Sequence, residues 1–439
     1  MKKQSPLILV FTVFFAINAA NLFAIGAGVT GLNFLKISQG ARPSGMGEAF
    51  TGIADDVNAI FWNPAGLGEL TRHQVTFMHT AWMMDVNFQY LAYALPVKGA
   101  GTFGIYGVLL NAGEINKTIE DSMGQYQSTD EKAGASSIHF TAAYAKKLSD
   151  ILGEGNVFSA LNAGISLGFS SEEIYTDSGS GFGADISFYY APKYEKYSAG
   201  LIVQNAGVST NRPGMPLTMR LGFGYRFAFE GILNAFSDDG YFMQLDEDTA
   251  AGIDIIYYPT EALARVNAGA EKFWTLSKYH KVALRFGYKF GYDLGIWSGF
   301  TFGAGYRLAA GVNSAVELDY VYSPYGDLGD SHRISITGKF LGAPETREHQ
   351  DKKAAVEYYR EGYELLNNRN YPEAVQKFSE ALKRDRDHAP SYMGMGASFL
   401  RLGKTDTARR VYLIALEKDP GNKKLMEFIE SYNWGIGNP

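Results

Sequence analysis

Few residues in this 439-residue sequence have the types and spacing that chemistry at a site requires. Gly26-Ala-Gly-Val-Thr-Gly31 matches the glycine pattern of a dinucleotide-binding loop, but it follows an apolar leader rather than a strand and opens no amphipathic helix. Gly164-Ile-Ser166-Leu-Gly168 matches the pattern of a nucleophile elbow. That motif requires a turn between a strand and a helix, whereas Ser166 lies within an alternating run. We therefore predict neither a nucleotide loop nor a serine nucleophile.

The other reactive residue types lead to the same prediction. Cysteine is absent, which excludes disulfides, thiolate metal sites, cysteine nucleophiles and a lipid anchor on cysteine. The seven histidines show no pair at metal-ligand spacing, and we expect each to be an interfacial, loop or linker residue: His73, His79, His139, His280, His332, His349 and His388. We predict no catalytic residue, no metal, no cofactor and no enzymatic activity. The net charge of -6 gives no basis for nucleic-acid binding.

Charged residues in the middle of the sequence share one face of alternating segments. They are Arg220, Arg226, Arg265, Arg285, Lys289 and Arg307, with Asp185, Asp254, Glu271, Glu317 and Asp319. A buried ligand carboxylate would need a basic partner, because an unpaired buried charge costs several kcal/mol. Two interpretations stay open: an internal ion-pair network that fills a lumen, or ligand binding. For ligand binding the candidates are Arg220, Arg285 and Arg307, with Arg285 and Arg307 preferred.

The segments that carry these charges predict a mainly β fold. From about residue 73 to 340 apolar residues alternate with small or charged ones, as between Leu217 and Phe227. Runs of about 9 to 13 residues suit strands that cross a membrane at a tilt. The sequence predicts about fourteen strands of an antiparallel transmembrane β-barrel, near 73–79, 86–95, 101–111, 136–146, 157–169, 181–191, 198–205, 217–228, 249–258, 264–273, 282–291, 299–308, 315–323 and 332–340.

The composition favours the same fold. Fifty glycines, 28 tyrosines and 29 phenylalanines suit a curved sheet that faces lipid and carries interfacial aromatic girdles. An even strand count places the start of the first strand and the end of the last strand on the same side of the membrane. The segment from Asn111 to Ala135 is then the longest external loop, and residues 229–248 form a long link on the opposite side.

The N-terminal region divides into a signal peptide, residues 1–24, and a plug, residues 25–72. Lys2 and Lys3 precede a short apolar stretch and a small-residue cleavage site at Ala24. In the plug, Asp55 and Asp56 are expected to cap a short helix that continues to Trp62. The Asn63-Pro64 pair ends it, because proline lacks a backbone donor.

The plug contains a string that resembles a known family. Gly40-Ala-Arg-Pro-Ser-Gly-Met-Gly-Glu-Ala-Phe50 and Ala54-Asp-Asp, followed by Asn63-Pro-Ala-Gly-Leu67, look like the plug of FadL-like outer-membrane barrels, PorV/PorQ-like branch, including spirochaete UPF0164-type proteins. The ending Asp327 to Ile336 agrees. The resemblance implies a fourteen-stranded barrel and, as the plug motif of this chain, Gly40, Ala41, Arg42, Gly45, Gly47, Asp55, Asp56, Asn63, Pro64 and Gly66.

Beyond residue 340 the periodicity becomes helical. Gly362, Ala374, Phe378 and Ala381 recur 34 residues later as Gly396, Ala408, Tyr412 and Ala415, and Pro420 holds a terminal position. This spacing is that of tetratricopeptide repeats. We predict a linker over 341–352, after a barrel over 73–340, and a small all-α domain of such repeats with a capping helix over 353–434. Such a domain binds partners.

These observations predict a bacterial outer-membrane channel or transporter, not an enzyme. It would contact outer-membrane lipid and pass long-chain fatty acids or other hydrophobic small molecules, while the repeats bind an unidentified protein partner in the periplasm. The alternative is a PorV-like type IX secretion shuttle or an envelope scaffold that acts through protein–protein interaction.

Overall fold

The structure is a computed structural model that describes residues 30–82, 86–120, 122–152, 158, 160–192, 196–227, 249–276, 279–291, 295–310, 314–342, 347–420, 422–432 and 434. The chain forms two units, Met1–Ala343 and Pro344–Pro439. The predicted signal peptide and the 229–248 link lie outside the described residues. No helix among the described residues is long and apolar enough to cross a membrane.

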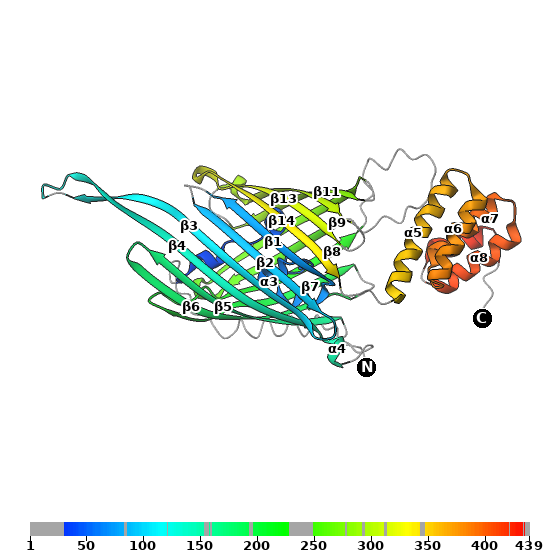
Figure 1. Ribbon diagram of the computed structural model, residues 1–439, viewed down its shortest axis with the longest axis horizontal. Helices are drawn as coiled ribbons and strands as arrows, with labels where there is room; N and C mark the ends of the chain where they lie inside the picture. The colour runs from blue at the N-terminus through cyan, green and yellow to red at the C-terminus, as the bar shows by residue number, and fades with distance from the viewer. Residues whose placement is uncertain are drawn as a thin grey trace. The chain divides into compact units, whose positions relative to one another are not determined.

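The first unit contains fourteen antiparallel strands that close into a barrel, as the sequence predicts (Figure 1). The strands are β1 (Arg72–Ala81), β2 (Asn87–Val97), β3 (Gly101–Glu120), β4 (Tyr126–Lys147), β5 (Leu161–Ile174), β6 (Asp177–Tyr190), β7 (Tyr197–Thr210), β8 (Thr218–Phe227), β9 (Thr249–Tyr258), β10 (Leu263–Thr275), β11 (His280–Phe290), β12 (Phe300–Ala309), β13 (Ala315–Pro324) and β14 (Asp330–Gly342). Each strand pairs with its sequence neighbours, and β14 closes the ring by pairing with β1.

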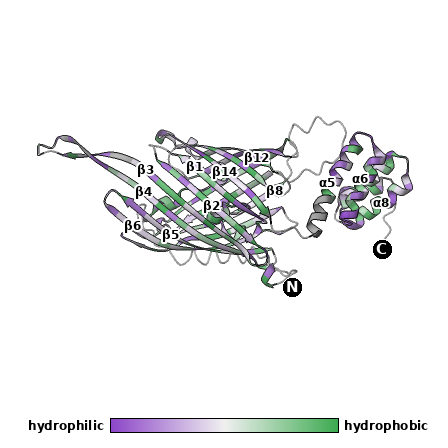
Figure 2. Ribbon diagram, in the orientation of Figure 1, coloured by the Kyte–Doolittle hydropathy of each residue, from purple (hydrophilic) through white to green (hydrophobic). Residues whose placement is uncertain are grey.

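Alternation along the strands separates an apolar exterior from a polar interior. In β1, Thr76, Met78 and Thr80 are buried, whereas Phe77 is 46% exposed. Figure 2 shows apolar residues along the strands of the barrel. Three exterior histidines bond to tyrosine hydroxyls, namely His73 to Tyr93, His280 to Tyr306 and His332 to Tyr320. Amphipathic rings of this kind suit a membrane–water boundary.

The structure corrects the predicted loop from Asn111 to Ala135. Most of this segment belongs to β3 and β4, which pair from Thr102 with Ala145 to Glu120 with Tyr126. The resulting hairpin extends beyond the other strands in Figure 1. Its outer part lacks a continuous apolar face, so hydrophobic alternation gave no signal for it.

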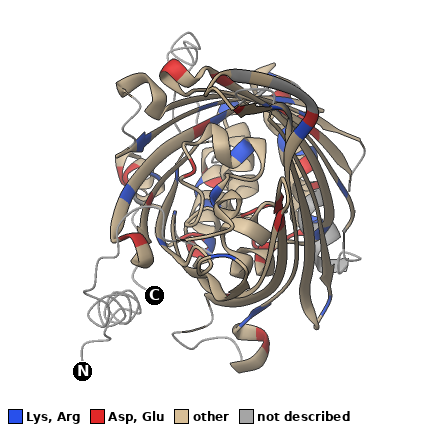
Figure 3. Cartoon of the chain, turned by 90° about the vertical axis from the view of Figure 1, so that its left-hand side faces the viewer, with Lys and Arg blue, Asp and Glu red and all other residues tan. Residues whose placement is uncertain are grey.

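Residues 30–71, which precede β1, fold inside the barrel, and we call them the plug. It contains the 3₁₀ helix η1 (Asn33–Lys36), helix α2 (Ala41–Gly45), helix α3 (Ala59–Trp62) and the 3₁₀ helix η2 (Pro64–Glu69). Figure 3 shows the strands as a ring seen from one end. A ring of fourteen strands is wider than wall side chains can fill, since about eight strands leave an interior that side chains fill. The plug fills the remaining space.

The described residues of the second unit form five helices: α5 (Arg347–Asn367), α6 (Tyr371–Arg384), α7 (Ala389–Arg401), α8 (Thr405–Lys418) and α9 (Lys423–Ser431). Helix α5 begins inside the 341–352 segment that was expected to be a linker. Gly362 and Gly394 both face Phe378, and Gly396 faces Tyr412. Ala374, Ala381, Ala408 and Ala415 are buried, and Pro420 follows the end of α8. Small residues thus let the aromatic rings fill the space between helices.

Candidate functional site

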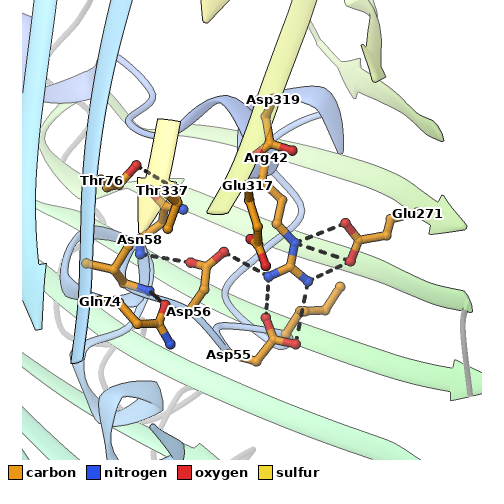
Figure 4. Close-up of polar contacts among 12 residues, drawn as sticks. Arg42, Asp55, Asp56, Asn58, Gln74, Thr76, Glu271, Glu317, Asp319 and Thr337 are labelled. Atoms are coloured by element: carbon orange, nitrogen blue, oxygen red, sulfur yellow. Dashed lines mark hydrogen bonds and ion pairs between the residues drawn. The ribbon is translucent and has the colours of Figure 1, made fainter. Parts of the chain in front are cut away.

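Arg42 of helix α2 joins the plug to the barrel wall. Its Nη1 donates to Asp55 Oδ1 at 2.6 Å and to Asp56 Oδ2 at 2.8 Å, and its Nη2 donates to Glu271 Oε1 at 2.6 Å. Figure 4 shows the guanidinium between these three carboxylates. Glu271 lies on β10, 229 residues from Arg42. Because Arg42, Asp56 and Glu271 are buried, the bonds among them are shielded from water, whereas the Asp55 side chain is 31% exposed. Together these charge-assisted bonds hold the plug in one position.

A network of charges continues from this arginine into the wall. Glu271 also accepts from Arg285 Nε at 2.8 Å, and Arg285 Nη1 donates to Asp319 at 2.8 Å. On β8, Arg226 Nη2 donates to Asp55 Oδ2 at 3.0 Å. The network therefore connects the plug with β8, β10, β11 and β13.

The two aspartates of the plug differ from the prediction that both cap a helix. Only Asp56 contacts a nearby backbone amide, by accepting from Asn58 N at 2.8 Å. Asp55 contacts Arg42 and Arg226 instead. Helix α3 begins after Asn58, which makes no side-chain cap, and ends at Trp62 as expected. Pairing with Arg42 and capping of the helix use the same carboxylates. For Asp55, pairing with the arginines replaces capping.

The remaining plug-motif residues also gather in the plug. Gly40 has a φ of +86°, and Ala41 is fully buried. Asn63 Nδ2 donates to Thr51 O at 3.0 Å, and Pro64 begins η2. A β-carbon on Gly66 would lie 2.1 Å from Ala54 O. The motif is therefore one folded unit.

A row of glycines on the inner wall lets the plug backbone approach the strands. Gly224 of β8 pairs with Gly252 of β9, Gly252 with Gly269 of β10, and Gly269 with Gly287 of β11. A β-carbon on Gly269 would lie 2.0 Å from Met46 O. We call Gly224, Gly252, Gly269 and Gly287 the glycine row. The strand register, which a single sequence hides, brings these residues together.

The wall contacts the plug differently on its other side. Ile60, Phe61 and Trp62 of the plug belong to the same apolar cluster as Phe88, Tyr90, Tyr106 and Val108 of β2 and β3. Phe61 and Tyr106 meet edge to face, with ring centroids 6.4 Å apart. The plug thus has a mainly apolar contact centred on β1 to β4, where Glu69 also pairs with Lys147 of β4. On β8 to β12 its contact consists of ion pairs, hydrogen bonds and glycine backbone.

Glu48 is a second ionic contact, which the predicted motif left out. Lys289 Nζ of β11 lies 3.3 Å from Glu48 Oε1. Burial alone would raise the pKa of Glu48, but the charges of Lys289, Arg333 and Arg220 lower it below its ordinary value. Glu48 is therefore a carboxylate surrounded by an excess of cations.

The arginines predicted to bind a ligand have protein partners in the structure. Arg285 pairs with Glu271 and Asp319, and Arg307 pairs with Glu317 at 2.5 Å. Arg220 lies over the Trp62 ring, 4.9 Å from its centroid, and donates to Gln204. The internal network accounts for Arg285 and Arg307, and their role in ligand binding stays a prediction.

Two residue types that suggested chemistry lie in structural positions. Ser166 is buried in the middle of β5, where its hydroxyl donates to Asp185. His139 corrects the expectation of an interfacial, loop or linker residue: it is buried on β4 and bonded to Tyr106 and Ser170 at 2.9 and 2.8 Å. These two partners lie on the neighbouring strands β3 and β5, and Thr141 of β4 itself lies 2.6 Å from Nε2 of the same ring. Within the described ranges, no group of three or more His, Cys, Asp or Glu could hold a metal ion.

A cavity of about 260 Å³ lies beside the plug. Its lining includes Ser38 and Glu48 of the plug, Lys289 of β11 and Arg333 of β14, together with Trp82 and Tyr325. These wall residues lie at the end of the barrel that carries the β1–β2, β9–β10 and β13–β14 connections, which we call the distal end. No pattern in the sequence predicts this cavity, and Arg333 is not among the predicted lumen charges.

The plug should remain seated in mild acid. Burial alone would raise the pKa of Asp55, but Arg42 and Arg226 lower it well below its ordinary value. A carboxyl with a lowered folded-state pKa contributes stability that is present above its unfolded pKa and is lost as pH falls through the folded one. We expect hydrogen exchange in residues 40–67 to be unchanged from neutral pH to about pH 4, near the ordinary Asp value. Loss of protection already at about pH 6 would contradict this assignment.

Comparison with known proteins matches residues 25–152 to the uncharacterised protein family UPF0164 and residues 359–423 to the tetratricopeptide repeat. A UPF0164 protein of Treponema pallidum (strain Nichols) is 21% identical over 394 residues, which cover 84% of this chain and 83% of the relative. These matches confirm the predicted resemblance to UPF0164-type proteins and the repeats.

Similar solved structures include the Pseudomonas putida toluene transporter TodX, with a TM-score of 0.44 and 10% identity over 73% of this chain and 98% of that one. A Pseudomonas aeruginosa FadL homologue has a TM-score of 0.41 and 10% identity, over 69% and 98%.

Proposed function

We propose that this chain, which combines a UPF0164-type plugged barrel with tetratricopeptide repeats, is an outer-membrane transporter for long-chain fatty acids or other hydrophobic molecules. The plug moves to let the ligand pass. No bond of the ligand is broken, so the protein is a transporter rather than an enzyme.

The observation that carries this proposal is the unequal contact between plug and wall. On β1 to β4 the contact is apolar, and separating it would expose hydrophobic surface to water at about 25 cal/mol per Å². On β8 to β12 it consists of ion pairs, hydrogen bonds and backbone against glycine. Water can solvate those groups after separation. We infer that the plug can separate from the strands of the ionic contact while it stays attached to β1 to β4.

The barrel exterior supports a membrane location. Leu91, Ile105, Phe140 and Leu167 are more than half exposed on successive strands, although they are large and apolar. Such a surface is stable against lipid and costly against water. We propose that the distal end faces the outside, and that the repeats lie in the periplasm and bind a protein partner there.

Uptake of a labelled long-chain fatty acid into liposomes that contain the purified full chain tests the transport step. We expect faster uptake than in liposomes that contain the protein with its plug residues cross-linked to the wall. Uptake no faster than in empty liposomes, together with no fatty acid in extracts of the purified protein, would exclude the proposal.

Because the chain has no native cysteine, the reactivity of a single introduced cysteine can be measured in the same liposomes. Thr301 is buried on β12, where it contacts Gly45 O and Gly47 N. We expect the cysteine in Thr301→Cys to react faster with a soluble thiol reagent when fatty acid is present. Gln74→Cys on β1, where the buried Gln74 accepts from Val57 N of the plug, is the matched control on the retained wall and should remain protected. Equal protection of both positions would show that the plug stays in place.

A second candidate function rests on the helical unit. Tetratricopeptide repeats bind protein partners and have no chemistry of their own, which suits a secretion shuttle or an envelope scaffold. Reproducible protein partners combined with the absence of any bound or transported small molecule would favour this function over transport.

A further inference from the structure

The cavity at the distal end contains a buried arginine without a carboxylate partner. Arg333 is 2% exposed. Its Nη1 donates to Ser38 Oγ at 2.7 Å, and its Nη2 donates to the Tyr325 hydroxyl at 3.4 Å. Among the described residues it forms no ion pair, and its Nε has no hydrogen-bond partner. Glu48 acts on this guanidinium only beyond ion-pair distance. A buried guanidinium without a directly bonded carboxylate is costly, which makes the position favourable for an anion.

Further donors without partners surround this arginine. Thr80 lies opposite Arg333 in the β1–β14 register, and Ser331 lies two residues before it, opposite Ser323 of β13. The three hydroxyls and the Trp82 indole Nε1 are buried and have no hydrogen-bond partner among the described residues. Buried polar groups are almost always satisfied in folded proteins. Two of the unused donors, Arg333 Nε and Trp82 Nε1, belong to residues that line the cavity, whereas the three hydroxyls lie on the neighbouring strand positions and not in its lining. The two lining donors favour a ligand that accepts hydrogen bonds.

The charges that line the cavity also favour an anion. Arg265, Lys36, Lys289 and Arg333 are cationic, whereas Glu48 and Glu261 are the acidic residues of the lining. Lys36 pairs with Glu261, and Lys289 pairs with Glu48. The lining thus has two more basic than acidic side chains.

The size and the walls of the cavity restrict the ligand. At about 260 Å³ it is smaller than the roughly 300–1,000 Å³ of sites for drug-sized ligands. Trp82 and Tyr325 form an aromatic pair with centroids 6.0 Å apart. Such a cavity fits a compact group with a flat apolar part, and it cannot enclose a long alkyl chain.

We propose that this cavity is a binding site for a small organic carboxylate, which pairs with Arg333 and Lys289 and competes with Glu48 for Lys289. Glu48 belongs to the plug, between the residues that contact the glycine row. A ligand that takes over Lys289 therefore weakens one of the ion pairs that hold the plug to β11. Only this consequence for the plug rests on the proposed transport function, and binding itself does not.

Titration calorimetry of the detergent-solubilised full chain with benzoate tests the site, with benzamide as the uncharged probe of the same shape. We expect benzoate to bind and benzamide to bind at least tenfold more weakly. In Arg333→Gln the affinity for benzoate should fall roughly tenfold to a hundredfold, since hydrogen bonds to charged groups are worth this much. Arg212→Gln, an arginine paired with Glu172 away from the cavity, should bind as the unmodified chain does.

A second variant changes the affinity in the opposite direction. Glu48→Gln removes the competing carboxylate, so benzoate should bind several-fold more tightly, which a misfolded protein could not produce. Equal binding of benzoate and benzamide, or unchanged affinity in both Arg333→Gln and Glu48→Gln, would overturn the proposal. Benzoate binding, combined with no fatty-acid uptake and no fatty acid in extracts of the purified protein, would leave this site standing and exclude the transport function.

Discussion

Replacing Gly287 with valine is expected to displace the plug from the barrel wall. A β-carbon at this position would lie 2.0 Å from Gly47 N and 2.4 Å from Met46 C. Both atoms belong to the plug backbone, so no side chain can rotate away. Overpacking costs about 1–3 kcal/mol and sometimes more, and here we expect the upper end. A cost of about 3 kcal/mol would reduce the seated population roughly a hundredfold.

Limited proteolysis and single-channel conductance measure this effect. We expect rapid cleavage within residues 40–67 and a large, steady conductance through the unplugged barrel. Gly338→Val on β14 is the matched control, because the nearest atom to its β-carbon would be 3.5 Å away, an ordinary contact. A resistant plug and a closed pore in Gly287→Val would show that the glycine row does not determine how the plug is seated.

Replacing Arg42 with glutamine is expected to release the plug as well, for an electrostatic reason. The change leaves Asp55, Asp56 and Glu271 close together without the guanidinium that neutralises them. Removing one partner from a buried ionic cluster costs about 3–5 kcal/mol. We expect hydrogen exchange in the plug to accelerate by two orders of magnitude or more, while exchange in the strands of the wall changes little.

Two companion variants separate the ionic effect from general damage. Lys117→Gln removes an exposed ion pair with Glu131 on the β3–β4 hairpin and should leave plug exchange unchanged, since surface pairs contribute little. Adding Asp55→Asn to Arg42→Gln removes one of the carboxylates that Arg42→Gln leaves without a guanidinium. Hydrogen exchange in the plug of the double variant should therefore accelerate less than the two single changes together predict. Strict additivity would mean that Arg42 and Asp55 do not act as a pair.

The fold could be predicted from sequence because its signals are local. Alternation with period two marks each strand, and the 34-residue repeat marks the helical unit. The β3–β4 extension was missed because its outer residues have no apolar face, so backbone pairing alone defines it. Where a strand faces neither lipid nor lumen, the alternating pattern is absent.

The site was harder to predict because its contacts are distant in sequence. The plug motif and the inward charges were visible, but the partner of each charge depends on strand register. Arg333 meets Ser38 across 295 residues, and the glycine row exists only when four strands are aligned. A single sequence shows that Gly287 faces inward, and it does not show which backbone lies against it.

The wall that makes ion pairs and glycine contacts with the plug is formed by the second half of the chain, and this determines the order of assembly. The plug is synthesised before the strands of this wall. Yet Gly47 bonds to Thr301, which lies 254 residues later, and Arg42 can pair with Glu271 only after β10 has been synthesised. Contacts between such distant residues form slowly, because the intervening chain must first be closed into a loop. The plug therefore cannot reach its final position before β9 to β14 are in place. Closing the ring and seating the plug are late, coupled events, during which the unfinished protein exposes the lumen charges and needs to be shielded from other chains.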